Sequence, residues 1–223
     1  MYKLLAREEN HIVVSKDEGV PFHKDKEQQG LVSNIRNDLH LNELYPVHRL
    51  DRMTSGLLLF ALDKTTAAEL SFRFAQGEVE KIYVAIAESK PQKKQGTVTG
   101  DMTRSRNGTW KLLRSRTNPA ITKFISTSMT PGLRVYLLKP LTGKTHQLRV
   151  ALKALGVPVA GDSLYYPANE NRFDRGYLHA YSLKFELKGK ELTYTDMPAD
   201  GELFKTEEFR SAFERIRLKA ENF

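Results

Sequence analysis

The sequence predicts one mixed α/β domain, and three observations support this. The chain has 223 residues, enough to bury one substantial core before a chain of this kind divides into several domains. Strand and helix periodicities alternate from end to end. No internal repeat, low-complexity run or interdomain linker interrupts them. We therefore expect a single domain over residues 1–223.

Five segments have the pattern of β-strands. Two of them are short apolar runs bounded by turn residues, as expected for strands buried in a sheet. In a third, Ile82 and Val84 fall on one face and Tyr83 on the other, because side chains alternate along a strand. The predicted strands cover 11–16, 56–62, 81–88, 133–139 and 178–187.

Three helices are predicted from their ends and their apolar stripes. The first covers about 66–76, with Thr66 and Glu69 spaced as a capping box and Gly77 as a left-handed stop. The second runs from about 145 to Gly156 and carries Arg149 beside its apolar stripe. The third begins near 206 with acidic residues in its first turn. The residues expected to face the core from the last two helices are Leu148, Leu152, Leu155, Phe209, Phe213 and Ile216.

The charge balance favours a polyanionic partner. The chain has 35 lysines and arginines against 27 acidic residues, a formal charge of +8. Between positions 104 and 123 there is no acidic residue, and the only tryptophan, Trp110, lies in this stretch. The stretch is interpreted either as a surface that faces phosphates or as a solvated hairpin. Its basic residues are Arg104, Arg106, Lys111, Arg114, Arg116 and Lys123.

Composition also excludes several classes of site. The chain has no cysteine, which excludes disulfides, thiolate zinc sites and a cysteine nucleophile. The first residues include charges and form no apolar stretch long enough for a signal peptide or a membrane span. We therefore expect a cytoplasmic protein that does not associate with membranes.

The most informative stretch is HRLDRMTSGLLL at 48–59. It places Asp51 between two arginines, immediately before a buried apolar strand. Nearby positive charge favours the ionised form of an acid, and the Thr-Ser-Gly sequence lets the backbone turn tightly into the strand. Taken alone, an aspartate in this position more often caps a turn or forms a salt bridge than takes part in catalysis.

This stretch closely resembles the HRLDxxTSGLLLxA motif of the RluA-type RNA pseudouridine synthases. Further segments resemble family signatures in the same order: KIYVA at 81–85, PLTGKTHQLRV at 140–150, GDSLY at 161–165 and LHA at 178–180. The similarity runs from about residue 4 to the end of the chain. It implies the α+β pseudouridine synthase fold, a mixed, largely antiparallel sheet flanked by helices with a central active-site cleft.

The chain departs from the family pattern at several positions. Lys144 stands where arginine is usual, Ala151 and Val157 where histidines are frequent, and Ser-Lys-Asp-Glu-Gly at 15–19 replaces Asn-Lys-Pro-x-Gly. These differences bear on loop detail and RNA preference. Many relatives carry an S4-type RNA-binding domain before the catalytic domain, and we expect that domain to be absent here.

The resemblance implies isomerisation of a uridine in ribosomal or transfer RNA. The reaction breaks the bond from C1′ to N1, turns the uracil, joins C1′ to C5 and removes the C5 proton. It is redox-neutral, so we expect no metal and no cofactor, in agreement with the lack of a phosphate-binding loop or dinucleotide fingerprint. By resemblance Asp51 is the catalytic carboxylate, and attack on C1′, addition at C6 and removal of the C2′ proton all remain open.

The resemblance also implies roles for Tyr83 and Arg149. Arg149 would pair with Asp51, since a buried carboxylate needs a donor to stay charged and a planar guanidinium matches it in two-pronged fashion. Tyr83 would stack on the extracted uracil, and its hydroxyl could help to remove the C5 proton. Without the resemblance, we would interpret Arg149 as a charged residue on the helix surface and Tyr83 as a half-buried strand tyrosine.

RNA binding is predicted for a further set of basic residues. An enzyme that acts on an internal base must take it out of the stack, and an arginine can occupy the vacated space. Arg49 is the candidate for that role, and Lys144, at the mouth of the second predicted helix, is a candidate phosphate ligand or else a solvated turn lysine. We interpret His146 and Gln147 as structural, setting the helix entry through bonds to nearby backbone. The predicted RNA-binding residues are Arg49, Lys144, Arg104, Arg106, Lys111 and Arg114.

Two other functions compete with this one. A non-catalytic RNA-binding module would keep the fold and the basic surface, but the presence of Asp51, Tyr83 and Arg149 argues against it. A metal-dependent hydrolase would need a site built from residues whose spacing fits no short ligand motif. Its candidate residues are His48, Asp51, His146 and His179. We expect RNA as the partner of a monomer, with no protein partner.

Overall fold

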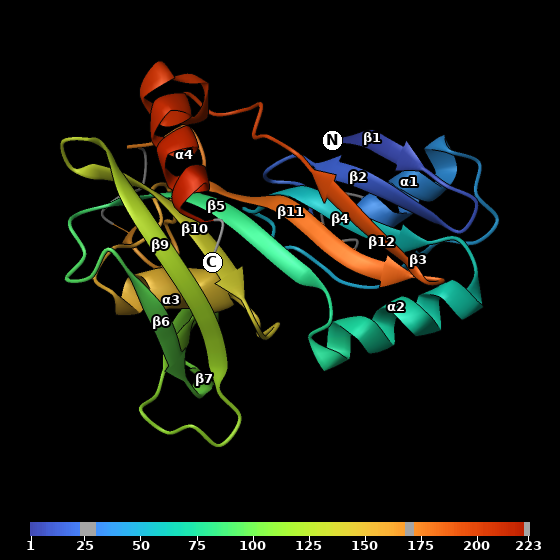
Figure 1. Cartoon of the computed structure of the whole chain (residues 1–223), viewed down its shortest axis with the longest axis horizontal. Coiled ribbons are helices and arrows are strands. Elements are labelled where there is room, and N and C mark those ends of the chain that lie inside the picture. Colours follow the sequence, from blue (N-terminus) through green and yellow to red (C-terminus); the bar gives the residue numbers. More distant parts are fainter. Residues whose placement is uncertain (23–29, 168–171, 221–223) are drawn as a thin grey trace. The chain divides into compact units, whose positions relative to one another are not determined.

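The computed structural model describes residues 1–22, 30–167 and 172–220. Two compact units make up the chain (Figure 1). The first comprises Met1–Lys81 and Ala180–Met197, and the second comprises Ile82–His179 and the residues from Pro198 onward. The single domain expected from the sequence stays a prediction.

The sheet of the first unit is centred on β4 (Ser55–Ala61). β2 pairs with one side of β4 and β11 lies on its other side. The short β3 pairs with the last two residues of β4, and β12 pairs with β11. The remaining strands are β1 (Tyr2–Arg7), β2 (His11–Lys16), β3 (Tyr45–Pro46), β11 (Leu178–Leu187) and β12 (Lys190–Thr195). Every residue of β4 is buried, which explains why it has a continuous apolar run instead of an alternating pattern.

Two helices, α1 (Leu31–Asp38) and α2 (Lys64–Gln76), belong to this unit. The capping box predicted for α2 is wrong. Asp63 is the N-cap, and its carboxylate accepts hydrogen bonds from the Thr66 amide at 2.8 Å and the Thr66 hydroxyl at 2.7 Å. Thr66 is thus the donor, because the helix begins two residues earlier than predicted. The stop at Gly77 is confirmed, with a φ of 75°.

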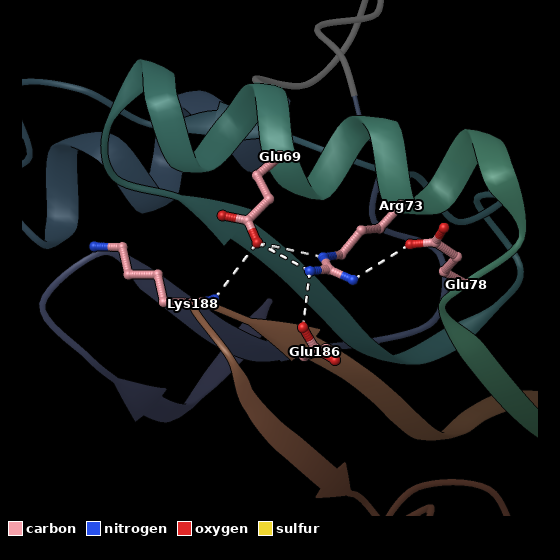
Figure 2. Close-up of polar contacts among 5 residues, drawn as sticks. All are labelled: Glu69, Arg73, Glu78, Glu186 and Lys188. Carbon is pink, nitrogen blue, oxygen red and sulfur yellow. Dashed lines mark hydrogen bonds and ion pairs between the residues drawn. The ribbon is translucent and has the colours of Figure 1, made fainter.

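Glu69 has a different role from the predicted cap. It accepts from Arg73 one turn along α2, and Arg73 also bonds Glu78 beyond the helix and Glu186 on β11 (Figure 2). A Glu69 oxygen accepts from the Lys188 backbone N–H as well. These contacts fasten α2 to the end of β11. Arg73 makes all three ion pairs from one side chain, an arrangement of more structural value than isolated surface pairs.

The second unit has an antiparallel sheet in the order β5-β10-β9-β6. A separate two-stranded hairpin, β7–β8, contains a short 3-10 turn, η1 (Arg106–Gly108). The strands are β5 (Glu80–Glu88), β6 (Gln95–Gly100), β7 (Met102–Arg104), β8 (Trp110–Leu112), β9 (Ala120–Thr130) and β10 (Leu133–Pro140). The first residues of β5 belong to the other unit.

Two helices pack on this sheet. α3 (Gln147–Ala154) contacts β8, β9 and β10, and α4 (Glu207–Lys219) lies against β9 and β10 (Figure 1). α4 follows the 3-10 turn η3 (Leu203–Lys205). The predicted start of α4 is confirmed, since the Thr206 hydroxyl accepts from the Phe209 amide at 3.1 Å. Phe209, Phe213 and Ile216 are buried as predicted.

α3 begins later than the sequence indicates. His146 has a φ of 57°, in the left-handed region, so helical geometry starts at Gln147 and not near 145. Leu148 and Leu152 are buried as predicted, whereas Leu155 is only partly buried at the helix end. Gly156 follows in the left-handed conformation and ends the helix.

The predicted fold class is confirmed as α+β with a mostly antiparallel mixed sheet and helices beside it. All five predicted strands are present, with ends displaced by no more than one residue. The sequence patterns did not predict α1, nor did they predict seven of the strands that the structure describes, among them the 11-residue β9. The strands missed are β1, β3, β6, β7, β8, β9 and β12. The central active-site cleft stays a prediction. Of the helices in the described ranges, none has the length and apolar character needed to cross a membrane.

Candidate active site

Asp51 lies in a tight turn that leads into β4. The Thr54 amide donates to the Asp51 carbonyl at 3.0 Å and closes the turn. Asp51 is half-buried, while its neighbours Leu50 and Thr54 are buried. The carboxylate therefore projects from a segment that is anchored on both sides.

The strongest anchor of this turn is Lys16, at the end of β2. Its side chain is fully buried, and its ammonium donates to the carbonyls of Asp17 at 2.8 Å, Val20 at 3.1 Å and Arg52 at 3.1 Å. A buried ammonium is costly unless it is hydrogen-bonded, and three carbonyls match its three donors. Lys16 thereby joins the loop that follows β2 to the residue next to Asp51.

Two further bonds strengthen the same junction. The Gly19 amide donates to the Arg52 carbonyl at 2.9 Å, and Arg52 Nε donates to the Gly19 carbonyl at 2.9 Å. Of the two arginines that flank Asp51, Arg52 thus contributes to holding the loop. Arg49 is exposed.

Gly56 fixes how the turn enters the sheet. Its φ is 105°, and a Cβ at this position would lie 2.4 Å from the Ala180 carbonyl oxygen. The Thr-Ser-Gly sequence therefore serves close packing of β4 against β11 as well as the backbone turn that the sequence predicted.

His48, at the head of the motif, has a structural role. Its Nε2 accepts from the Leu59 amide at 2.9 Å, and its ring stacks on Phe74 of α2 at 4.6 Å. Burial of the ring, and then the nearby charge of Lys81, lowers the pKa of His48 to about 3. Lys81 lies over the same Phe74 ring at 5.8 Å. His48 is therefore a neutral hydrogen-bond acceptor that holds the motif against β4 and α2.

Tyr83 lies near the start of β5, in register with Leu138 of β10. It is half-buried, and the four residues that follow it, 84–87, are buried on both faces of the strand. Tyr83 thus stands where β5 emerges from the core.

Arg149 is buried on α3 and binds Asp162 through two parallel hydrogen bonds. Nε donates to Oδ2 at 2.7 Å and Nη2 donates to Oδ1 at 2.8 Å. Only 7% of the Arg149 side chain and 1% of the Asp162 side chain are exposed. The interpretation of Arg149 as a surface helix charge is therefore wrong. Pairing with Asp51 stays a prediction, and the guanidinium has five donors, of which this pair uses two.

The predicted structural role of Gln147 is confirmed. Its Oε1 accepts from the Lys144 amide at 2.9 Å and the Thr142 hydroxyl at 2.7 Å, while Nε2 donates to Ile121 O and Thr122 Oγ1, each at 3.0 Å. His146 bonds the side chain of Tyr165 at 2.9 Å. The ammonium of Lys144 donates to Asn118 at 2.8 Å.

The basic stretch covers most of the β7–β8 hairpin, the loop that follows and the start of β9, where Lys123 lies. Asp101, just before the stretch, accepts from the amides of Thr117 at 3.0 Å and Asn118 at 2.8 Å and so shapes this loop. The Arg104 guanidinium lies 5.7 Å from the Trp110 ring. All six basic residues of the stretch are exposed, an arrangement that fits both interpretations given by the sequence.

The three histidines named for a metal-dependent hydrolase make local contacts. His48 accepts from the backbone, His146 bonds Tyr165, and the His179 ring makes an edge contact with Phe204. Within the described ranges, no group of three or more histidine, cysteine or acidic residues is arranged to hold a metal ion.

Comparison with known families decides between the functions that the sequence left in competition. The RNA pseudouridylate synthase family matches residues 10–154, a range that contains Asp51, Tyr83 and Arg149. The chain belongs to this family. It is an isomerase that acts on RNA, and the RluA-type resemblance of its motifs is confirmed.

Individual relatives of this pseudouridine synthase agree with the family match. An uncharacterized RNA pseudouridine synthase of Haemophilus influenzae is 45% identical over 202 residues, which cover 91% of this chain and 90% of that protein. The dual-specificity RNA pseudouridine synthase RluA of Pasteurella multocida is 32% identical, over 86% of this chain and 91% of its own. The solved structure of Human RNA Pseudouridylate Synthase Domain Containing 1 aligns with a TM-score of 0.74 at 28% identity, over 88% of this chain and 83% of that one.

Several residues that support the pseudouridine synthase site were missed from the sequence. Lys16 and Asp162 were part of quoted segments, but their contacts with Arg52 and Arg149 join different elements of the fold. Two signals were available in the sequence. Lys16 is a lysine at the end of an apolar strand, and Asp162 directly follows a glycine in a family segment. Tyr165, in the same segment as Asp162, was quoted without a role.

We predict a pH dependence of folding that arises from His48. Its pKa of about 3 in the folded chain lies below the ordinary value of 6.5, so the unfolded chain binds the proton first as the pH falls. Stability is therefore lost from pH 6.5 downward, by up to about 2 kcal/mol at pH 5. Denaturant unfolding of the wild type and of His48→Gln, whose amide oxygen accepts without titrating, measures this. An equal loss in both proteins between pH 7 and pH 5 would contradict the prediction.

Proposed function

We propose that this chain converts a specific uridine of a structured ribosomal or transfer RNA to pseudouridine, with Asp51 as the catalytic carboxylate. The proposal rests on membership of the family and on one structural observation, the anchored turn that carries Asp51. Three carbonyls around a buried ammonium, together with the bonds between Gly19 and Arg52, leave the turn little freedom. Nucleophilic or base catalysis by a carboxylate needs such a fixed position beside the sugar.

Tyr83 and Arg149 complete the proposed catalytic group. Tyr83 is half-buried near the start of β5, next to the buried residues 84–87, a position suited to stacking on an extracted base. Arg149 is held by the bidentate pair with Asp162, which fixes the plane of its guanidinium before any substrate binds. A guanidinium held in this way is suited to pair with the carboxylate of Asp51 on another edge.

The proposed RNA contacts are basic and lie at the surface. Arg49 fills the gap that the flipped base leaves, and its exposure next to the Asp51 turn supports this role. Lys144 and the β7–β8 stretch bind phosphates through charge, a contact that needs no defined sequence. The phosphate contacts from the stretch are assigned to Arg104, Arg106, Lys111 and Arg114.

The proposed enzyme works as a monomer in the cytoplasm, with residues 1–223 as one catalytic domain. It needs no protein partner, because every residue proposed for the reaction comes from this chain. It needs no metal or cofactor, because the isomerisation transfers no electrons to or from an outside acceptor.

We predict that Asp51→Asn abolishes pseudouridine formation. The change keeps the size of the side chain but removes the reactive charged oxygen. Purified wild type and variant would each be incubated with total RNA from cells that lack the gene, and pseudouridines would then be mapped. Sites gained with the wild type identify the target, and all of them should be missing with the variant.

Folding and RNA binding provide the controls for this comparison. Asp51→Asn should unfold at a denaturant concentration close to that of the wild type and should bind the target transcript with a similar Kd. Turnover by Asp51→Asn within about tenfold of the wild-type rate would refute the role of Asp51.

We predict that Arg49→Ala slows turnover more on a structured transcript than on one in which a mismatch leaves the target uridine unpaired. Extraction of a stacked base costs a few kcal/mol, and a side chain that fills the gap offsets this cost only when the base starts in the stack. Single-turnover rates on the two transcripts give the comparison.

Lys111→Ala and Arg114→Ala serve as the matched controls. They should weaken binding of both transcripts equally and reduce its salt dependence, because a phosphate contact releases counterions regardless of pairing. If Arg49→Ala slows both transcripts by the same factor, Arg49 has no role in flipping.

A further inference from the structure

Tyr165 is buried at the meeting point of three parts of the second unit. It is 3% exposed, and its hydroxyl accepts from the Trp110 amide at 2.9 Å. The same hydroxyl lies 2.9 Å from Nδ1 of His146. The hydroxyl thus links β8 to the residue that precedes α3.

The ring of Tyr165 supports the basic face of α3. The Arg149 guanidinium lies 4.9 Å from the ring centroid and the Lys153 ammonium 5.4 Å from it. Cations at this distance from an aromatic face are attracted by its quadrupole. The backbone amide of Tyr165 also donates to Asp162 Oδ1 at 3.2 Å, the oxygen that accepts from Arg149 Nη2. Tyr165 therefore contacts both members of the Arg149–Asp162 pair.

The other end of this connection is the basic hairpin. Trp110 is the first residue of β8, and its ring lies below Arg104 of β7. Lys111 follows Trp110 on β8 and is exposed. In the part of the chain that the structure describes, the hairpin forms its own two-stranded sheet, and α3 packs against β8. The Tyr165 hydroxyl therefore forms a direct hydrogen bond between the proposed RNA-binding hairpin and the residue whose ring lies against Arg149.

We propose that Tyr165 is a positioning residue that couples RNA binding by the β7–β8 hairpin to the orientation of Arg149. RNA phosphates bound to the hairpin fix the position of the Trp110 amide. The hydrogen bond from this amide then fixes the Tyr165 hydroxyl and with it the Tyr165 ring. The ring and Asp162 together orient the Arg149 guanidinium. This coupling rests on the proposed function, since it presumes that Arg149 serves the reaction. Its effect falls on the chemical step, because small displacements of a reacting group cost rate far more than affinity.

Tyr165→Phe isolates the hydroxyl, because it keeps the ring beneath Arg149 and Lys153. The test uses the transcript that carries the pseudouridine site formed by the wild type. At saturating transcript we expect kcat to fall about tenfold or more, with Kd changed by less than about threefold. Tyr166→Phe, the same change at the exposed neighbouring residue, should leave both values unchanged.

A double-mutant cycle with Lys111→Ala separates coupling from a merely structural role. With the hydroxyl present, loss of the phosphate contact at Lys111 should lower kcat as well as raise KM. In the Tyr165→Phe background, Lys111→Ala should raise KM only, because the hairpin no longer acts on Arg149. Asp162→Asn leaves the Trp110 bond in place, so it should lower kcat while Lys111→Ala still lowers kcat further.

The outcomes are distinguishable. Wild-type kcat in Tyr165→Phe, or effects of Tyr165→Phe and Lys111→Ala on kcat that simply multiply, would overturn the coupling and leave the proposed function intact. If Tyr165→Phe does not fold, the kcat of Asp162→Asn provides the test. A kcat equal to that of the wild type would overturn the claim that Asp162 and Tyr165 orient Arg149 for the reaction. A wild-type protein that forms no pseudouridine would overturn the proposed function and the coupling together.

Discussion

The buried ammonium of Lys16 is the interaction on which the Asp51 turn depends. It is a fully buried charge, and it binds carbonyls on both sides of the junction between the loop after β2 and the loop before β4. Without those carbonyls the charge would be too costly to bury, and without the charge each of the three carbonyls would lose a donor. Charge and turn therefore stabilise each other, and the result is a carboxylate at a fixed place at the start of a fully buried strand.

The motifs divide into residues proposed for chemistry and residues that hold them. His48 and Gly56 lie in the Asp51 motif, yet His48 accepts from β4 and Gly56 permits the approach of β11. Lys81, from the segment that carries Tyr83, packs on Phe74 of α2. In the second unit, Asp162 and Tyr165 hold Arg149 in the same way. Much of each motif thus fixes backbone and side-chain positions around one proposed reactive group.

The sequence predicted what short-range patterns determine. The apolar run of β4, the stop at Gly77 and the helix start near Thr206 all follow from a few neighbouring residues, and all are confirmed. Thr66 was assigned as a cap because it is a good one, but Asp63 precedes it and the helix begins earlier. The start of α3 was missed because the left-handed His146 has no sequence signal. The contact of Lys16 with Arg52 and that of Arg149 with Asp162 were missed because each joins residues in different elements, which no local pattern pairs.

The most direct test of the central claim is the single-turnover rate of Lys16→Met on the target transcript. Methionine keeps the volume and apolar character of the lysine stem but removes the three bonds that hold the Asp51 turn. Lys184→Met, at a partly exposed lysine of β11, is the matched control and should keep the wild-type rate. Measured well below the unfolding temperature, Lys16→Met should be slower by about 100-fold, with Kd for the transcript nearly unchanged. A rate equal to that of the wild type would contradict the claim that the buried ammonium positions Asp51.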